Sequence, residues 1–249
     1  MPTVLLPGWG NSVCSLNKLK EKINNSCVFD YTYGNNCNVF KNFDEMNEVF
    51  DKFISNEINP DDELNIIGYS QGGIIAIYYF GIHETRINKY VSIASPHCGA
   101  FGEKWNSWGN TGGVTYDFTW NSDFMTRKYP EASEKFFKLN HKKENILQIW
   151  SDEDKIAIPE SSKRFVDMNL MSDCEIEYQR KSTLDQETSE NIDRFFSKLS
   201  DDLKKPTKGM RDIVNGNYNK KLLTKIKSDT NHLSMPLSDV VVDHIVRFL

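Results

Sequence analysis

The amino-acid sequence predicts an α/β protein in which a mostly parallel sheet is covered by helices on both faces. Short apolar segments alternate with segments of helical periodicity, and strand–helix–strand units place neighbouring strands parallel. A second observation is the stretch 64–80, in which an apolar strand, a Gly-x-Ser-x-Gly turn and an apolar helix follow one another. This order places a serine at the end of a strand, where ligands of such sheets bind.

Apolar residues at helical spacing separate the strands of the first half of the chain. Leu16, Leu19 and Ile23 mark a first helix, and apolar residues from Phe43 to Ile54 mark one face of a second, amphipathic helix. The pattern predicts strands at 4–6, 27–29 and 64–67 and helices at about 14–24, 43–54 and 73–80.

Two stretches interrupt this alternation in the second half. Residues 99–140 are rich in tryptophan, phenylalanine and glycine, and residues 160–220 contain one expected strand at 175–178 and one expected helix around 192–199. The remaining pattern predicts strands at 90–94, 146–150 and 222–226 and a helix at 240–249. We expect a single domain over residues 1–249 with insertions at about 99–140 and 160–220. A separate domain at 160–220 is the alternative.

Composition and charge exclude several classes of function. The net charge is −5 with both signs mixed along the chain, which argues against a nucleic-acid partner. The apolar runs are too short to span a bilayer, and the N-terminus lacks the features of a signal peptide. Five cysteines without a Cys-x-x-Cys pair favour free thiols in a reducing, cytoplasmic setting and argue against a zinc site. A disulfide among Cys14, Cys27 and Cys37 is the alternative.

The candidate nucleophile is Ser70, at the centre of the Gly68–Gly72 turn. A nucleophile at such a turn must sit with its hydroxyl exposed beyond the strand, and flanking side chains would collide with the neighbouring strand and helix. Small residues at Gly68 and Gly72 meet this requirement. An ordinary glycine-rich strand-to-helix turn is the competing interpretation.

A serine nucleophile needs a base, and His232 is the best candidate among the histidines. Imidazole titrates near neutrality, and the triad order in this strand–turn–helix class is Ser, acid, His. His232 follows the last predicted strand by a short loop and precedes the terminal helix. The others lie too soon after Ser70, in a polar loop, or inside the terminal helix: His83, His97, His141 and His244.

The acid that orients the base is expected directly after the strand at 146–150. Asp152, Glu153 and Asp154 compete there. Asp154 is favoured because it lies further beyond the strand, just before the apolar Ile156, which would turn the loop back toward the core. A solvated acidic loop is the alternative.

The oxyanion of an acyl-transfer reaction needs two preorganised N–H donors. The backbone of Gln71, directly after the candidate nucleophile, is expected to supply one. The loop after the first strand, Gly8–Trp9–Gly10, is expected to supply the other from Trp9, because its glycines let the backbone approach a substrate closely. An ordinary glycine-rich turn is again the alternative.

These residues resemble the α/β-hydrolase superfamily and, within it, the lipases and esterases. The resemblance is carried by residues 5–10, 68–73, 92–99 and 117–124, by Asp154 with Ile156, and by His232 with Leu233. It implies the α/β-hydrolase fold with a minimal N-terminus, in which Ser70 follows the strand usually counted fifth. Pro7 departs from the family, which usually has His before the oxyanion-loop glycine, and residues 160–220 are specific to this chain.

The resemblance implies a serine hydrolase of carboxylic acyl esters that uses neither metal nor cofactor. Its partner would be a small-molecule acyl ester or an acyl-carrier-bound substrate. The aromatic stretch 99–140 would form a lid-like cover over the acyl group, with substrate contacts from Trp105, Trp108, Trp120 and Phe124. Ordinary core packing of these aromatics is the alternative.

Two other functions remain open. One is hydrolysis of acyl-carrier or acyl-CoA esters or thioesters, as in the esterases that unmask a pimeloyl methyl ester. The other is a non-catalytic binding module, because this fold hosts many functions and resemblance alone does not fix the reaction.

Overall fold

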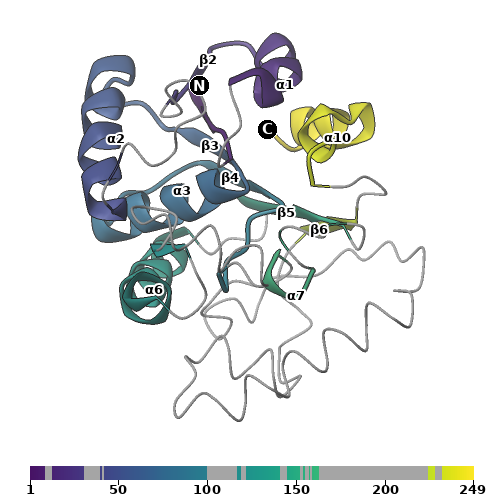
Figure 1. Cartoon of the computed structure of the whole chain (residues 1–249). Helices are drawn as coiled ribbons and strands as arrows, with labels where there is room; N and C mark the ends of the chain where they lie inside the picture. Colours follow the sequence, from purple (N-terminus) through teal and green to yellow (C-terminus); the bar gives the residue numbers. More distant parts are fainter. Residues whose placement is uncertain are drawn as a thin grey trace, which may run out of the picture.

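A six-stranded parallel sheet runs through the part of the chain that the computed structural model describes (Figure 1). That part comprises residues 1–8, 13–30, 40, 42–99, 117–118, 122–140, 145–151, 154, 157, 159–162, 224–227 and 232–249. The strand order is β2-β1-β3-β4-β5-β6, and every neighbouring pair is parallel. The strands are β1 (Thr3–Leu6), β2 (Ser26–Val28), β3 (Asn65–Tyr69), β4 (Lys89–Ile93), β5 (Ile146–Trp150) and β6 (Thr224–Lys227).

Helices cover both faces of this sheet (Figure 1). Alternate strand residues point to opposite faces, and accordingly Leu6 and Ile66 belong to one apolar cluster whereas Leu5 and Ile67 belong to the other. The first cluster is completed by α2 (Phe43–Glu57), α3 (Gln71–Ile82) and α6 (Tyr129–Asn140). The second is completed by the 3-10 turn η1 (Val13–Leu16), α1 (Asn17–Lys22) and α10 (Asp239–Phe248).

The predicted elements within the described residues are confirmed, with boundaries shifted by a few residues. The strand at 146–150 has the expected bounds, and α3 begins earlier than expected, at Gln71. The first predicted helix is the 3-10 turn η1 followed by α1, and α10 forms despite its β-branched start. The strand expected at 175–178 and the helix expected around 192–199, within the predicted insertion at 160–220, lie outside the described residues.

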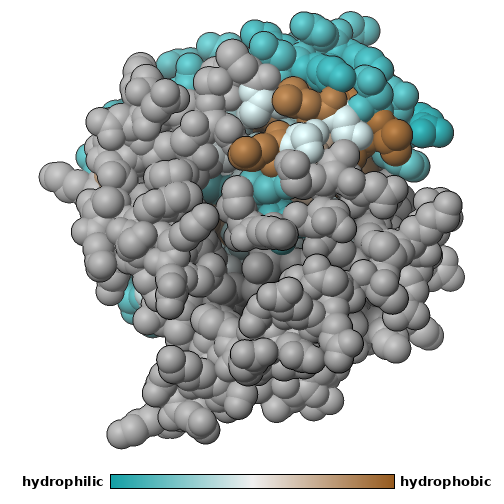
Figure 2. Space-filling model, turned by 45° about the vertical axis from the view of Figure 1, so that its right-hand side comes forward, coloured by the Kyte–Doolittle hydropathy of each residue, from teal (hydrophilic) through white to brown (hydrophobic). Residues whose placement is uncertain are grey.

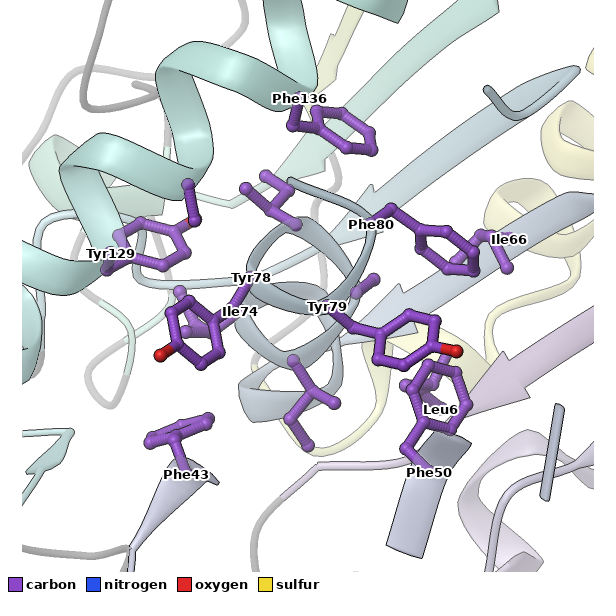
Figure 3. Packing of buried hydrophobic residues seen from close by; sticks show 14 of the residues in the cluster. Leu6, Phe43, Phe50, Ile66, Ile74, Tyr78, Tyr79, Phe80, Tyr129 and Phe136 are labelled. Atoms are coloured by element: carbon purple, nitrogen blue, oxygen red, sulfur yellow. The ribbon is translucent and has the colours of Figure 1, made fainter. Parts of the chain in front are cut away.

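Helix α3 is the centre of the first cluster and is buried on nearly all sides (Figure 3). Its sequence is apolar all round, as a helix must be when it lies between a sheet and other helices. Phe43 and Phe50 of α2 and Tyr129 and Phe136 of α6 pack around it (Figure 3). A Cβ at Gly81 would lie 2.1 Å from the Ala132 carbonyl oxygen, so this glycine permits the close contact of α3 with α6.

The segment 122–140 differs from the prediction, because it packs in the core and does not form part of a cover. A π-helical turn, η4 (Phe124–Lys128), leads directly into α6. Phe124, the predicted substrate contact, is 3% exposed and stacks on Phe43 with ring centroids 4.0 Å apart. The physical reason is that α3 buries the apolar face of α6. We therefore do not keep the predicted substrate contact for Phe124. The rest of the predicted cover, 100–116 and 119–121 with Trp105, Trp108 and Trp120, lies outside the described residues.

Replacement of Phe124 by Ala tests this assignment. We expect Phe124→Ala to lower the free energy of unfolding by about 3–5 kcal/mol, because it leaves a cavity against Phe43. Val246→Ala, at a position 38% exposed on α10, serves as the control and should change stability by less than about 0.5 kcal/mol. Urea denaturation followed by circular dichroism measures both. Unchanged stability with a selective loss of activity on long acyl chains would restore Phe124 to the substrate site.

Candidate active site

Ser70 lies at the junction of β3 and α3 in a strained backbone conformation. Its dihedral angles are φ 53° and ψ −121°, in a region that a residue with a side chain rarely occupies. Such a conformation costs on the order of 1–3 kcal/mol and persists only where the surroundings hold it. Here the Ser70 N–H donates to the Ile93 carbonyl at 2.8 Å, and the Gly73 N–H donates to the Ser70 carbonyl at 3.1 Å.

The two glycines that flank this turn are required by close contacts. A Cβ at Gly68 would lie 2.4 Å from the Cα of Gly73, and a Cβ at Gly72 would lie 2.2 Å from the Leu6 carbonyl oxygen. Both distances are shorter than real Cβ contacts allow. The steric reason that the sequence suggested for these glycines is therefore confirmed.

The structure brings Ser70, His232 and Asp154 into one hydrogen-bonded chain. Ser70 Oγ lies 3.0 Å from His232 Nε2, and His232 Nδ1 lies 2.7 Å from Asp154 Oδ2. All three are buried, with 6%, 5% and 2% of their surfaces exposed respectively. The three side chains follow β3, β6 and β5, whose parallel arrangement brings their carboxyl ends to the same edge of the sheet.

The carboxylate of Asp154 is held on both oxygens. Oδ2 faces the His232 ring, and Oδ1 accepts a hydrogen bond from the Ala157 N–H at 2.8 Å. The Asp154 N–H itself donates to the Ser151 carbonyl at 3.3 Å, which folds the chain into a turn directly after β5. A carboxylate fixed at both ends has one orientation toward the imidazole. Asp152 and Glu153, the competing acids, lie outside the described residues.

The loop after β5 that contains Asp154 is called the acid loop. A short helix, α7 (Pro159–Ser162), connects it by hydrogen bonds to the loop that follows β4. The buried Ser161 Oγ accepts from the Cys98 N–H at 3.1 Å and donates to the Gly99 carbonyl at 2.9 Å. Ser162 Oγ donates to the Ala157 carbonyl at 3.3 Å, and Gln148 of β5 donates to the Ser162 carbonyl. Sequence reasoning missed these residues, because neither a glutamine within a strand nor serines after one give a signal of such contacts.

The N-terminus of α3 adjoins Ser70, so backbone N–H groups gather where an oxyanion would form. Gln71 is the first residue of α3 and is fully buried. Such a helix end carries a partial positive charge that favours a nearby anion. A Cβ at Gly8 would lie 2.9 Å from Ser70 Cβ, so the loop after β1 passes against Ser70. Trp9, the other predicted donor, lies outside the described residues.

The other histidines in the described residues lie elsewhere. The fully buried His97 has its Nε2 2.8 Å from Ser92 Oγ and its Nδ1 2.7 Å from the Tyr129 hydroxyl. Burial raises the pKa of Tyr129 well above its usual range, which keeps this phenol protonated. The His83 ring packs at a tilt against the Tyr79 ring, and His244 lies in α10. His141 lies outside the described residues.

The described residues contain no group of three or more His, Cys, Asp or Glu side chains arranged to hold a metal ion. Cys27 and Cys98 form no disulfide within the same ranges. Neither does any helix there combine the length and the apolar character that crossing a membrane requires. The Cys14 side chain, Cys37 and Cys174 lie outside this part of the chain.

Exposed apolar side chains follow His232 in the chain. Leu233 follows it directly and is 59% exposed, and Leu237 and Val240 are 39% and 66% exposed. Figure 2 shows apolar residues gathered on one face of the molecule.

Comparison with known proteins settles the family. The sequence pattern of the family described as having the alpha/beta hydrolase fold matches residues 6–165, well over half of the chain. The chain belongs to the α/β-hydrolase fold family. A search of curated proteins found no match to this α/β-hydrolase.

Solved structures share the fold of this α/β-hydrolase at low sequence identity. A lipase-esterase related protein from Clostridium acetobutylicum has a TM-score of 0.52 and 11% identity, with 100% of this chain and 94% of that chain covered. A monoacylglycerol lipase from Paleococcus ferrophilus has a TM-score of 0.50 and 13% identity, with coverage of 99% and 95%. A structure from a study of two metagenome-derived lipolytic enzymes has a TM-score of 0.51 and 10% identity, with coverage of 99% and 92%.

Replacement of Ser161 by Ala tests the connection between the two loops. We expect Ser161→Ala to lower the free energy of unfolding by about 1–3 kcal/mol, because the buried Cys98 N–H and Gly99 carbonyl both lose their partner. The matched control is Ser133→Ala on α6, since the Ser133 hydroxyl is also buried but has no hydrogen-bond partner within the described ranges. That change should be neutral or slightly stabilising. Equal effects of the two substitutions in chemical denaturation would contradict the connection.

Proposed function

We propose that this α/β-hydrolase is a serine hydrolase of carboxylic esters that works through an acyl-enzyme. The observation that carries the proposal is the continuous hydrogen-bonded chain from Ser70 through His232 to Asp154. This chain lies at the carboxyl ends of the strands, where parallel sheets of this class bind ligands. The support for the proposal is chemical as well as geometric, because a hydroxyl needs a base and the base needs an orienting carboxylate.

In the proposed reaction Ser70 Oγ attacks the acyl carbonyl while His232 Nε2 takes the hydroxyl proton. The 3.0 Å separation of Oγ and Nε2 suits this transfer. Asp154 accepts a hydrogen bond from the Nδ1–H of His232, which selects the tautomer with a free lone pair on Nε2 and stabilises the imidazolium that forms. His232 then returns the proton to the leaving alkoxide. A water, deprotonated by His232 in turn, releases the acid and regenerates Ser70.

The charge on the carbonyl oxygen would be held by the backbone N–H groups of Gln71 and Trp9. The support for Gln71 is its place at the start of α3, directly after Ser70. Support for the second donor is the passage of the loop after β1 against Ser70, at Gly8. Donors of this kind are fixed by the fold before the substrate arrives, so they need no reorganisation during the reaction.

An apolar acyl group suits the surroundings of this site. Leu233, Leu237 and Val240 follow the proposed base within eight residues of the chain and are exposed, and ligand sites are mostly apolar with a few polar groups. Trp105, Trp108 and Trp120 remain proposed contacts of the acyl group. No such argument fixes the leaving group, because the same triad hydrolyses oxygen esters and thioesters alike.

A substrate panel tests the proposal. Nitrophenyl esters with acyl chains from acetyl to lauroyl are compared with acyl-CoA thioesters of the same chains, together with a fluorophosphonate probe. We expect labelling of Ser70 and a higher kcat/KM for the oxygen esters. Labelling with a preference for the thioesters would move the substrate class to carrier-bound acyl groups. No turnover and no labelling would favour a non-catalytic module.

Replacement of Ser70 by Ala should abolish labelling and lower kcat on the order of 10⁶-fold, because the three residues act as a unit. Activity and labelling of purified protein measure this, with circular dichroism to show that the variant folds. Ser95→Ala, at a buried serine of the loop after β4, is the control and should retain labelling. A fluorophosphonate adduct on a different residue, with Ser70 unlabelled, would refute the assignment.

Replacement of each competing acid by its amide should separate their roles. Asp154→Asn should lower kcat by about 10⁴-fold, because the amide cannot hold His232 in the required tautomer. Asp152→Asn is the matched control and should retain most of the activity. A larger loss from the Asp152 change than from the Asp154 change would assign the acid to Asp152.

A further inference from the structure

The residue before the nucleophile, Tyr69, contacts the residue that carries the proposed base. Its hydroxyl donates to the His232 backbone carbonyl at 2.8 Å. Its ring also packs against the His232 imidazole, with centroids 5.2 Å apart and an angle of 37° between the planes. Tyr69 is fully buried, so both contacts are shielded from water.

The position of Tyr69 in β3 explains how one side chain makes these contacts. Tyr69 shares a face of the sheet with Ile67, two residues earlier, and both belong to the cluster that α1 and α10 cover. Because Tyr69 ends the strand, its hydroxyl extends past this cluster toward the turn that contains His232. Met235, directly after that turn, is buried in the same cluster, so the turn is anchored to the cluster on both sides.

Tyr69 also supports the loop that follows β1. A Cβ at Gly8 would lie 3.2 Å and 3.3 Å from two carbons of the Tyr69 ring, so the loop backbone rests against it. A single side chain therefore contacts the His232 backbone and the loop proposed to supply an oxyanion donor, and its own backbone leads directly into Ser70.

We propose that Tyr69 is a positioning residue that fixes His232 relative to Ser70. The inference rests on the proposed function. Asp154 holds the imidazole at Nδ1, whereas Tyr69 holds the backbone of the same residue at its carbonyl and packs against the ring. Holding the backbone as well as Nδ1 limits how far Nε2 can move from Ser70 Oγ, whereas the Nδ1 hydrogen bond alone would let the ring pivot. Misplacement of a catalytic group by about 1 Å costs on the order of 10²-fold in rate.

The test compares Tyr69→Phe with Tyr90→Phe. Phenylalanine keeps the ring and removes only the hydroxyl. Tyr90 is the matched control, because it is also fully buried and its hydroxyl donates to a backbone carbonyl, that of Gly73, at 3.1 Å. Active sites are first counted by fluorophosphonate titration, so that kcat is expressed per competent site. The rate of fluorophosphonate inactivation, kcat, KM and the thermal midpoint are then measured.

For Tyr69→Phe we expect kcat per active site and the inactivation rate to fall by about tenfold, with KM changed by less than about twofold. Tyr90→Phe should lower the thermal midpoint to a similar extent but leave both rates near those of the wild type. This split is the signature of positioning, because a purely structural role would lower stability without changing the rate per competent site.

Two results would overturn the inference. Unchanged rates per active site in Tyr69→Phe would show that the hydroxyl does not position the base. Equal losses of rate in the two variants would assign the effect to general loosening of the core. Failure of the proposed function is seen separately, because wild-type Ser70 would then remain unlabelled by the probe.

Discussion

The close approach of α3 to the strands beside Ser70 is the constraint on which the rest of the structure depends. With Gly73 against Gly68 and the Leu6 carbonyl against Gly72, no side chain fits at either glycine. The turn between them forces a positive φ on Ser70. That conformation survives because β3 lies inside the sheet, between β1 and β4, and α3 is enclosed by α2 and α6. The core thus keeps Ser70 in a conformation that it would not otherwise adopt.

The candidate site is assembled from loops that parallel strands bring to one edge. Ser70 follows β3, Asp154 follows β5, and His232 follows β6, with β4 between β3 and β5. The loop after β4 joins the arrangement through Ser161, which ties it to the acid loop. Each polar group is therefore fixed by hydrogen bonds to a neighbouring loop, so the separations of Oγ, Nε2 and Nδ1 from their partners are set before any ligand binds.

Sequence reasoning could propose the parts of the candidate site that depend on local pattern and chain order. A strand, a glycine-flanked turn and a helix pointed to Ser70, and the order of acid and histidine after it favoured Asp154 and His232, and the structure brings these three side chains together. Contacts between distant segments were not predictable, since nothing local to Tyr69 or Ser161 shows what their hydroxyls meet. Aromatic content misled at Phe124, because a cover and a core both need aromatic side chains. The apolar face of α6 distinguishes a core segment from a cover. It can be interpreted in this way only once α3 is known to pack against that face.

The pairing of α1 with α10 links assembly of the site to the order of synthesis. Lys18 and Lys22 form ion pairs with Asp239 and Asp243 at 3.1 Å and 2.7 Å, and apolar residues of both helices share one cluster. The ribosome makes β1, α1 and the Ser70 turn long before it makes His232. A nascent chain therefore contains Ser70 before it contains His232, and α1 is made before its partner α10. Because α10 follows His232 closely in the chain, the proposed base and the helix that covers this face of the sheet are made at the same late stage.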